Sequence, residues 1–198
     1  NISADFESSN NTIRFGHRKT ADKDIYFIAN RTNAKQATTC AFRVEGTPEL
    51  WNSVTGESRK ITDYSVENGI TTIPLEFFPY ESFFVVFPGN KNRGTIAKTG
   101  KGNFPTFNKL KTIEGAWNVS FDSKFGGPSA IEFDKLQDWT DREMRGIKYY
   151  SGIATYKKTF NIENLEDKTY FIDLGVVNDI ARVKLNGKDI GVVWCAPW

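Results

Sequence analysis

The sequence predicts an all-β protein with two antiparallel β-sandwich domains. Three observations support this: short aromatic and β-branched runs recur, Gly, Asn and Pro separate them, and no stretch of residues 1–90 keeps an apolar 3.6-residue period over three turns. A chain of 198 residues can form two small domains, each with its own core. We predict a small β-sandwich over residues 1–90, a linker over 91–112 and a second sandwich over 113–198.

The first domain contains four runs whose residue types are typical of strands. Segments with Gly, Asn and Pro lie between the runs and supply the backbone angles that tight turns need. Short strands at this spacing favour a sandwich. The four predicted strands are residues 25–29, 38–44, 70–75 and 82–87.

The linker is distinguished by its charge. Residues 91–112 hold six basic and no acidic residues, and they are rich in Gly, Asn and Lys. Such a composition is typical of a solvated connection between domains. The alternative is a basic strip that binds anions, but only Phe104 and Phe107 accompany the charges, so the linker is favoured.

The second domain repeats the strand pattern and adds a clear hairpin. Residues 180–185 and 189–194 flank Asn186-Gly187, and Asn-Gly between alternating runs is a strong hairpin signal. Further predicted strands cover residues 117–121, 153–160 and 169–174. Together these runs predict a jelly roll.

Charge and composition exclude several function classes. The formal net charge is +2, from 26 basic and 24 acidic residues, so we expect no nucleic-acid partner. No run approaches eighteen apolar residues, so no membrane span is predicted. Cys40, Cys195 and His17 are too few for a zinc cluster. We expect unpaired structural cysteines, and a neutral histidine that is hydrogen-bonded in a domain interface in preference to a catalytic one. We predict no cofactor or metal, although a structural Ca²⁺ stays open as an unassigned possibility.

The order of the motifs in residues 113–198 resembles a known domain. These residues are similar to the galactose-binding-like jelly roll found as the sugar-binding domain of glycoside hydrolase family 2. The motifs are Trp117-Asn118-Val119, Lys148-Tyr149-Tyr150 leading to Phe160, and Ala181 to Gly191. The first domain, with Phe15-Gly16-His17-Arg18, Leu50-Trp51 and residues 82–87, together with that jelly roll resembles the C-terminal region of glycoside hydrolase family 106, the α-L-rhamnosidase-like enzymes.

The resemblance implies that the reaction takes place elsewhere in a longer bacterial protein. In that family the catalytic carboxylates lie on an upstream (β/α)₈ barrel, which needs about 250 residues with eight helices and does not fit in this chain. We therefore expect a non-catalytic accessory fragment that packs against the barrel, and we assign no catalytic residue. The jelly roll is expected to be truncated at its C-terminus, which leaves an unpaired edge on the 180–194 hairpin. The parent is expected to be periplasmic or extracellular.

Carbohydrate is the expected ligand class if the fragment binds anything by itself. Sugar binding by a β-sandwich rests on exposed aromatic rings that stack on the C–H face of a pyranose, surrounded by polar side chains. Trp117 is expected to lie in a core instead, and Trp51, which follows Leu50 before a turn, is expected to be packed. The carbohydrate-binding candidates are Trp139, Tyr149, Tyr150, Asn178, Asp179, Arg182, Trp194 and Trp198.

Two other functions remain open at this point. An autonomous carbohydrate-binding module would need exposed aromatics in a preformed groove. A small hydrolase would need two convergent carboxylates. The acidic residues of the segment 134–143 alternate with basic ones, which favours a solvated face over a catalytic pair.

Overall fold

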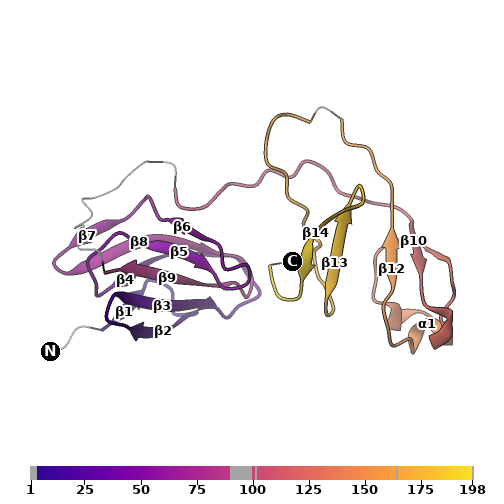
Figure 1. The fold of residues 1–198 in the computed structure, drawn as a ribbon, viewed down its shortest axis with the longest axis horizontal. Helices are drawn as coiled ribbons and strands as arrows, with labels where there is room; N and C mark the ends of the chain where they lie inside the picture. The colour runs from indigo at the N-terminus through magenta and orange to yellow at the C-terminus, as the bar shows by residue number, and fades with distance from the viewer. Residues whose placement is uncertain (1–3, 90–99, 101, 164, 198) are drawn as a thin grey trace. The chain divides into compact units, whose positions relative to one another are not determined.

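Antiparallel strands make up nearly all of the regular structure in this computed structural model, which describes residues 4–89, 100, 102–163 and 165–197. The predicted all-β fold class is confirmed. The helical segments among the described residues are short: α1 (Arg145–Lys148), η1 (Ser123–Phe125) and η2 (Trp139–Asp141). The chain forms two compact units, one of residues 107–170 and one of residues 1–106 with 171–198 (Figure 1).

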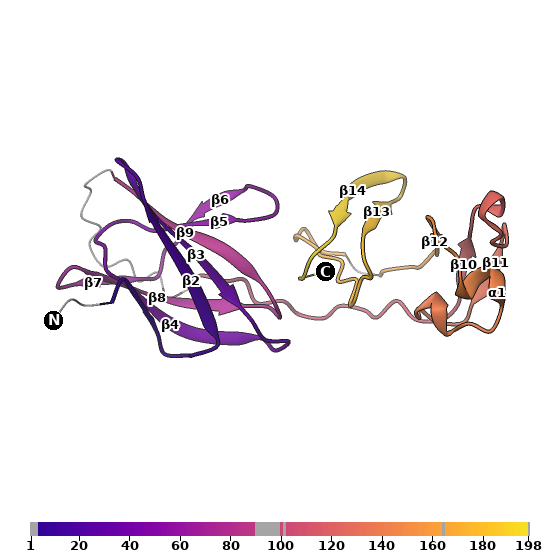
Figure 2. The same cartoon turned by 90° about the horizontal axis from the view of Figure 1, so that it is seen from below.

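The N-terminal part is a sandwich of two antiparallel sheets (Figure 2). One sheet has the order β1-β4-β8-β7, with β1 (Phe6–Ser8), β4 (Gln36–Phe42), β8 (Ile70–Phe77) and β7 (Ser65–Glu67). The other has the order β2-β3-β9-β5-β6, with β2 (Ile13–Lys19), β3 (Lys23–Asn30), β9 (Ser82–Pro88), β5 (Glu49–Asn52) and β6 (Ser58–Lys60).

Alternation along the long strands builds the core of this sandwich. On β3, Tyr26 and Ile28 are fully buried, whereas the intervening Phe27 is exposed. Tyr26 is the register partner of Val85 on β9, and Ile28 is the partner of Phe83, so all four side chains share the inner face. The four predicted strands are confirmed as β3, β4, β8 and β9.

The strands that the sequence pattern did not reveal are short or polar. Strand β2 carries Arg14, His17, Arg18 and Lys19 in seven residues, and it lies at the edge of its sheet, where polar side chains are tolerated. Strands β1, β6 and β7 have three residues each, which is too short for a period to show.

Two residues of the predicted linker dock on the first sandwich. Asn103 is 7% exposed, and its side chain makes four hydrogen bonds to the backbone of Thr62, Asp63 and Pro74. Phe104 packs beside Phe83, with 6.1 Å between the ring centroids. The predicted linker therefore contains a fixed anchor at 103–104, while its residues 91–99 and 101 lie outside the described residues.

The unit of residues 107–170 contains a small three-stranded sheet. Its order is β11-β10-β12, with β11 (Ile131–Phe133), β10 (Trp117–Ser120) and β12 (Thr155–Lys157). Val119, Phe121, Phe133, Ile147 and Tyr150 form its core, and the half-buried Trp117 packs against them. The expectation that Trp117 lies in a core is confirmed.

The predicted hairpin is present as β13 (Ala181–Leu185) and β14 (Lys188–Val193). Asn186 and Gly187 have φ angles of 51° and 80°, the left-handed values that a tight turn between antiparallel strands needs. Within the described part of the chain the two strands pair only with each other, which confirms the expected unpaired edge.

The predicted strand at residues 169–174 is wrong. No strand of the described chain lies beside this segment to accept its backbone hydrogen bonds, so it stays irregular and exposed. In residues 113–198 the described strands form two separate sheets, β11-β10-β12 and β13-β14. The single jelly roll over this region stays a prediction.

Candidate functional site

Two of the candidate sugar-binding aromatics are packed inside the unit of residues 107–170. Tyr150 is 6% exposed, and its hydroxyl donates to the carbonyl of Ile153 and accepts from the backbone N–H of Asp122. Trp139 packs edge-on against Tyr150, with 6.1 Å between the ring centroids. Trp139 also lies 5.8 Å from Phe121. Both side chains support the core in this structure.

The turn that holds Trp139 is fixed by the preceding aspartate. The Asp138 carboxylate accepts from the backbone N–H of Thr140 at 2.9 Å and from its hydroxyl at 2.8 Å. The backbone hydrogen bond and then the side-chain one lower the pKa of Asp138. Asp138 is therefore a cap of η2, and its ionised form is the structural one.

Tyr149 points to solvent, unlike its neighbour. It is 70% exposed and follows helix α1 directly. Tyr149 and Tyr150 therefore differ in exposure at the end of a helix, where Tyr149 is the C-terminal cap of α1. Among the candidates in this unit, Tyr149 has the accessible ring.

The remaining described candidates lie at one end of the hairpin. Asn178 and Asp179 are exposed and precede β13, and Arg182 on β13 has its Nε atom 3.8 Å from the Asp189 carboxylate on β14. Trp194 is 57% exposed. It follows Val193, the register partner of Ala181, so it lies at the same end of the hairpin as Asn178 and Asp179. Trp198 lies outside the described residues.

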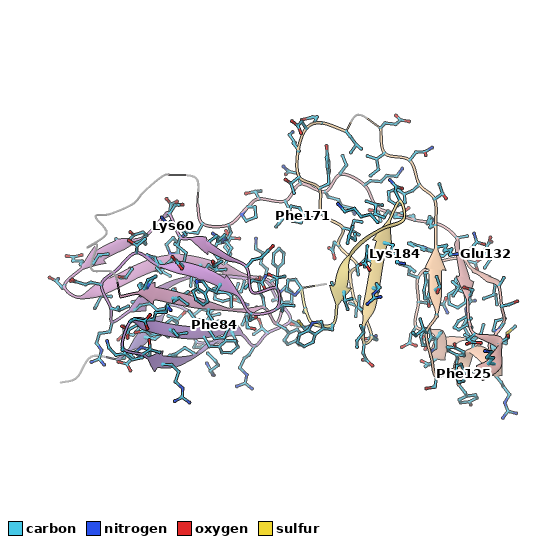
Figure 3. The ribbon with its side chains drawn as sticks, viewed as in Figure 1. Lys60, Phe84, Phe125, Glu132, Phe171 and Lys184 are labelled. Atoms are coloured by element: carbon cyan, nitrogen blue, oxygen red, sulfur yellow. The ribbon has the colours of Figure 1, made fainter. Side chains whose placement is uncertain are left out.

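The hairpin and the segment before it expose many large apolar side chains. Figure 3 marks this region with Phe171 and Lys184. A two-stranded hairpin is marginally stable in water, and a covering layer is the usual source of its stability. The exposed apolar residues here are Phe171, Ile172, Val176, Ile180, Leu185, Ile190, Val192 and Trp194.

A network of charged side chains surrounds His17, and no sequence motif signals it. The Nδ1 atom of His17 is 3.3 Å from the Asp5 carboxylate, and Nε2 is 3.0 Å from the Asp24 carboxylate. The imidazole also stacks on Tyr26, with 4.1 Å between the centroids and 4° between the planes.

This network joins the two sheets of the first sandwich. His17 belongs to β2 in one sheet, while Asp5 precedes β1 and Arg43 follows β4 in the other. The Asp5 carboxylate contacts both His17 and Arg43, and hydrogen bonds first to His17 and then to Arg43 lower the pKa of Asp5. The expected hydrogen bonding of His17 is confirmed, but its partners lie within the first sandwich and not at a domain interface.

Cys40 is a buried structural residue. Both cysteines are unpaired, and Cys40 lies in the core of the first sandwich. Burial raises the pKa of the Cys40 thiol to about 12, so the reactive thiolate does not form at neutral pH.

A shallow depression on the first sandwich has little catalytic character. Its volume is about 330 Å³, and Asp63, Ser65, Thr72 and Pro74 are among the residues that line it. Asp63 is the one carboxylate in this lining, whereas glycoside hydrolysis takes two. Across the described ranges, no three His, Cys, Asp or Glu side chains are arranged to hold a metal ion.

Comparison with known proteins gives a consistent result. A family model described as alpha-L-rhamnosidase, of glycoside hydrolase family 106, matches residues 1–66. A rhamnosidase structure from Novosphingobium sp. PP1Y aligns with 98% of the chain at 35% identity and a TM-score of 0.77. The chain resembles the family 106 α-L-rhamnosidases. The predicted resemblance is confirmed.

The relatives are much longer than this chain. A Formosa agariphila protein named "Putative beta-glucuronidase" is 40% identical over 89 residues, which is 43% of this chain and 8% of that protein. The chain spans 19% of the rhamnosidase structure.

Within the described residues, no helix has both the length and the apolar content for a membrane span.

Proposed function

We propose that this chain is a non-catalytic accessory region of a longer bacterial glycoside hydrolase of the α-L-rhamnosidase type. It packs against a catalytic barrel outside this chain, and its second part completes a galactose-binding-like jelly roll there. The parent acts on carbohydrate in the periplasm or outside the cell.

The observation that carries the proposal is the apolar surface of the hairpin region. Trp194, Ile190 and Val192 are exposed together with the irregular segment that precedes β13. A surface with this many apolar side chains favours burial against a partner, because the burial of apolar surface stabilises by about 25 cal/mol per Å². A surface of this kind supports docking against further chain in the parent.

The chemistry available in the described residues supports the non-catalytic part of the proposal. Asp138 is a helix cap, and the Asp5 and Asp24 carboxylates flank His17. These acidic groups have structural partners, and the depression on the first sandwich offers one carboxylate. Two carboxylates across a sugar-sized space are the requirement for glycoside hydrolysis.

Two measurements on the isolated chain and on the full-length parent test the proposal. The parent should release nitrophenol from 4-nitrophenyl α-L-rhamnopyranoside, and the isolated chain should not. Amide hydrogen exchange of residues 181–193 should be fast in the isolated chain and at least tenfold slower in the parent. Turnover by the isolated chain, or equal exchange in both proteins, contradicts the proposal.

A further inference from the structure

The outer face of the five-stranded sheet carries a row of aromatic side chains. Phe27 on β3 is the register partner of Phe84 on β9, and Phe84 is also the partner of Trp51 on β5. Cross-strand partners project from the same face of a sheet. Their sequence neighbours Tyr26, Phe83 and Leu50 belong to the buried core, so the three rings lie on the opposite, outer face. Figure 3 marks this sheet with Phe84.

The row is accessible and partly pre-organised. Phe27 is 39% exposed, and Phe84 and Trp51 are half-buried. The centroids of Phe27 and Phe84 are 5.2 Å apart, and the Trp51 indole N–H donates to the Glu49 carboxylate at 2.9 Å, which fixes the indole. Adjacent strands lie about 4.8 Å apart, so the row spans roughly 10 Å, about the length of two pyranose rings.

The small residues at the two ends of the row leave it open. Gly16 on β2 is the partner of Phe27, and no atom lies within 4 Å of where its Cβ would be. Ser58 on β6 is the partner of Trp51. A ligand that is longer than the row can therefore continue past both edges.

The same face is bordered by cations. Arg14 and Arg18 lie two residues either side of Gly16 on β2, so they project from the same outer face. Lys60 lies two residues after Ser58 on β6 and projects from that face too. Arg14 donates to the Asn11 and Ile13 carbonyls, and Arg18 forms no ion pair in the described part of the chain. Lys60 is exposed and lies opposite Glu49 as its register partner. The acidic residue on the face is Glu49, which the Trp51 indole holds.

We propose that this face binds an acidic oligosaccharide. The apolar C–H faces of two successive sugar rings stack on Phe27, Phe84 and Trp51, because the π face of an aromatic ring is negative and attracts C–H groups. The carboxylates of the ligand lie toward Arg18 and Lys60 at the two borders. The rings explain why an oligosaccharide can stack here, and the exposed cations at the two borders explain the selection of an acidic one.

This inference goes beyond the proposed accessory role and does not depend on it. The row lies entirely on the first sandwich, whereas the accessory role rests on the hairpin region. Failure of binding on this face leaves the activity and exchange measurements of the parent unaffected.

Calorimetric titration of the 198-residue chain tests the proposal. The probes are a hyaluronan hexasaccharide, which carries glucuronate carboxylates, and the neutral hexasaccharide of laminarin. We expect saturable binding of the acidic probe, at least tenfold tighter than that of the neutral one, and a loss of affinity with added salt. Absence of hyaluronan binding, or equal affinity for both probes, overturns the proposal.

Variants separate stacking from charge. Phe84→Ser and Trp51→Ala should each weaken hyaluronan binding at least tenfold, while the matched control Phe125→Ser, which removes an exposed ring of the other unit, should leave it unchanged. The double change Arg18→Ala and Lys60→Ala should weaken binding of the acidic probe and reduce its salt dependence. Because these two side chains are exposed, the double variant remains informative even if Phe84→Ser fails to fold. Unchanged affinity in the double variant contradicts the assigned role of the cations.

Discussion

Replacement of Asn103 by alanine should release the linker anchor and destabilise the first sandwich. The Oδ1 atom of Asn103 accepts from the backbone N–H groups of Thr62 and Asp63, at 3.1 and 2.8 Å. Its Nδ2 atom donates to the carbonyls of Asp63 and Pro74, at 2.7 and 3.1 Å. The amide therefore fills all four of its hydrogen-bonding positions from a site that is 7% exposed.

The expected loss is about 3 kcal/mol. A buried hydrogen bond contributes about 1 kcal/mol net, and a donor left unsatisfied costs about 1–3 kcal/mol. Thr62 and Pro74 are exposed, so water can replace the lost partner at the Thr62 N–H and at the Pro74 carbonyl, and the N–H and carbonyl of Asp63 account for most of the loss. Phe104, next in the chain, should then lose part of its packing against Phe83.

Hydrogen exchange with mass spectrometry in increasing urea measures this loss separately for each unit. Peptides of β4 and β8 should unfold at lower urea in Asn103→Ala, while peptides of β10 and β12 act as an internal reference and stay unchanged. The matched control is Asn108→Ala, five residues along the same segment at an exposed position. A change below about 0.5 kcal/mol in β4 and β8 would refute the anchor, because it is less than one net hydrogen bond.

Asn103→Asp should destabilise the first sandwich at least as much as Asn103→Ala. It replaces the NH₂ group that donates to two carbonyl oxygens with a carboxylate oxygen, which can only accept hydrogen bonds. Urea midpoints of the two variants check this. The pKa of Asp5 is lower in the folded than in the unfolded protein. The ionised carboxylate therefore stabilises the fold at pH values above the unfolded pKa of about 3.9. This stabilisation is lost as the pH falls through the folded pKa. Urea midpoints at pH 5 and pH 3 should therefore differ less in Asp5→Asn than in the unchanged protein. Iodoacetamide at pH 8 should modify Cys195 and spare Cys40, whose pKa burial raises to about 12; mass spectrometry that finds Cys40 modified in folded protein would count against this. Gly187→Ala should cost about 1 kcal/mol at its left-handed φ, measured as faster amide exchange in β13 and β14 than in the unchanged chain.

The strands that could be predicted from the sequence are those whose own residues show a strand pattern. Strands β3, β4, β8 and β9 are long, β-branched and aromatic, and their alternation is visible without any partner. The Asn186-Gly187 turn was predictable for the same reason, because the backbone angles it needs are a property of those two residues. Local chemistry was sufficient in each case.

Features that depend on a partner were not predictable in this way. The segment 169–174 has strand-like residues but lacks a neighbouring strand in the described chain, and a strand exists only where a ladder satisfies its backbone. Strand β2 has polar residues and is nonetheless a strand, because β3 pairs with it along seven residues. Tyr150 was a candidate for an exposed ring, and packing against Phe121 places it in the core.

The sequence by itself determined the fold class, the hairpin turn and the resemblance to the rhamnosidase family, because residue types and turn chemistry are local properties of the chain. Only the tertiary structure decided that Asn103 is an anchor and that Phe27, Phe84 and Trp51 share one outer face. These three residues are far apart in the chain, and the order and register of β3, β9 and β5 bring them together. Register depends on hydrogen bonds between distant segments, so it appears only when the sheet is formed.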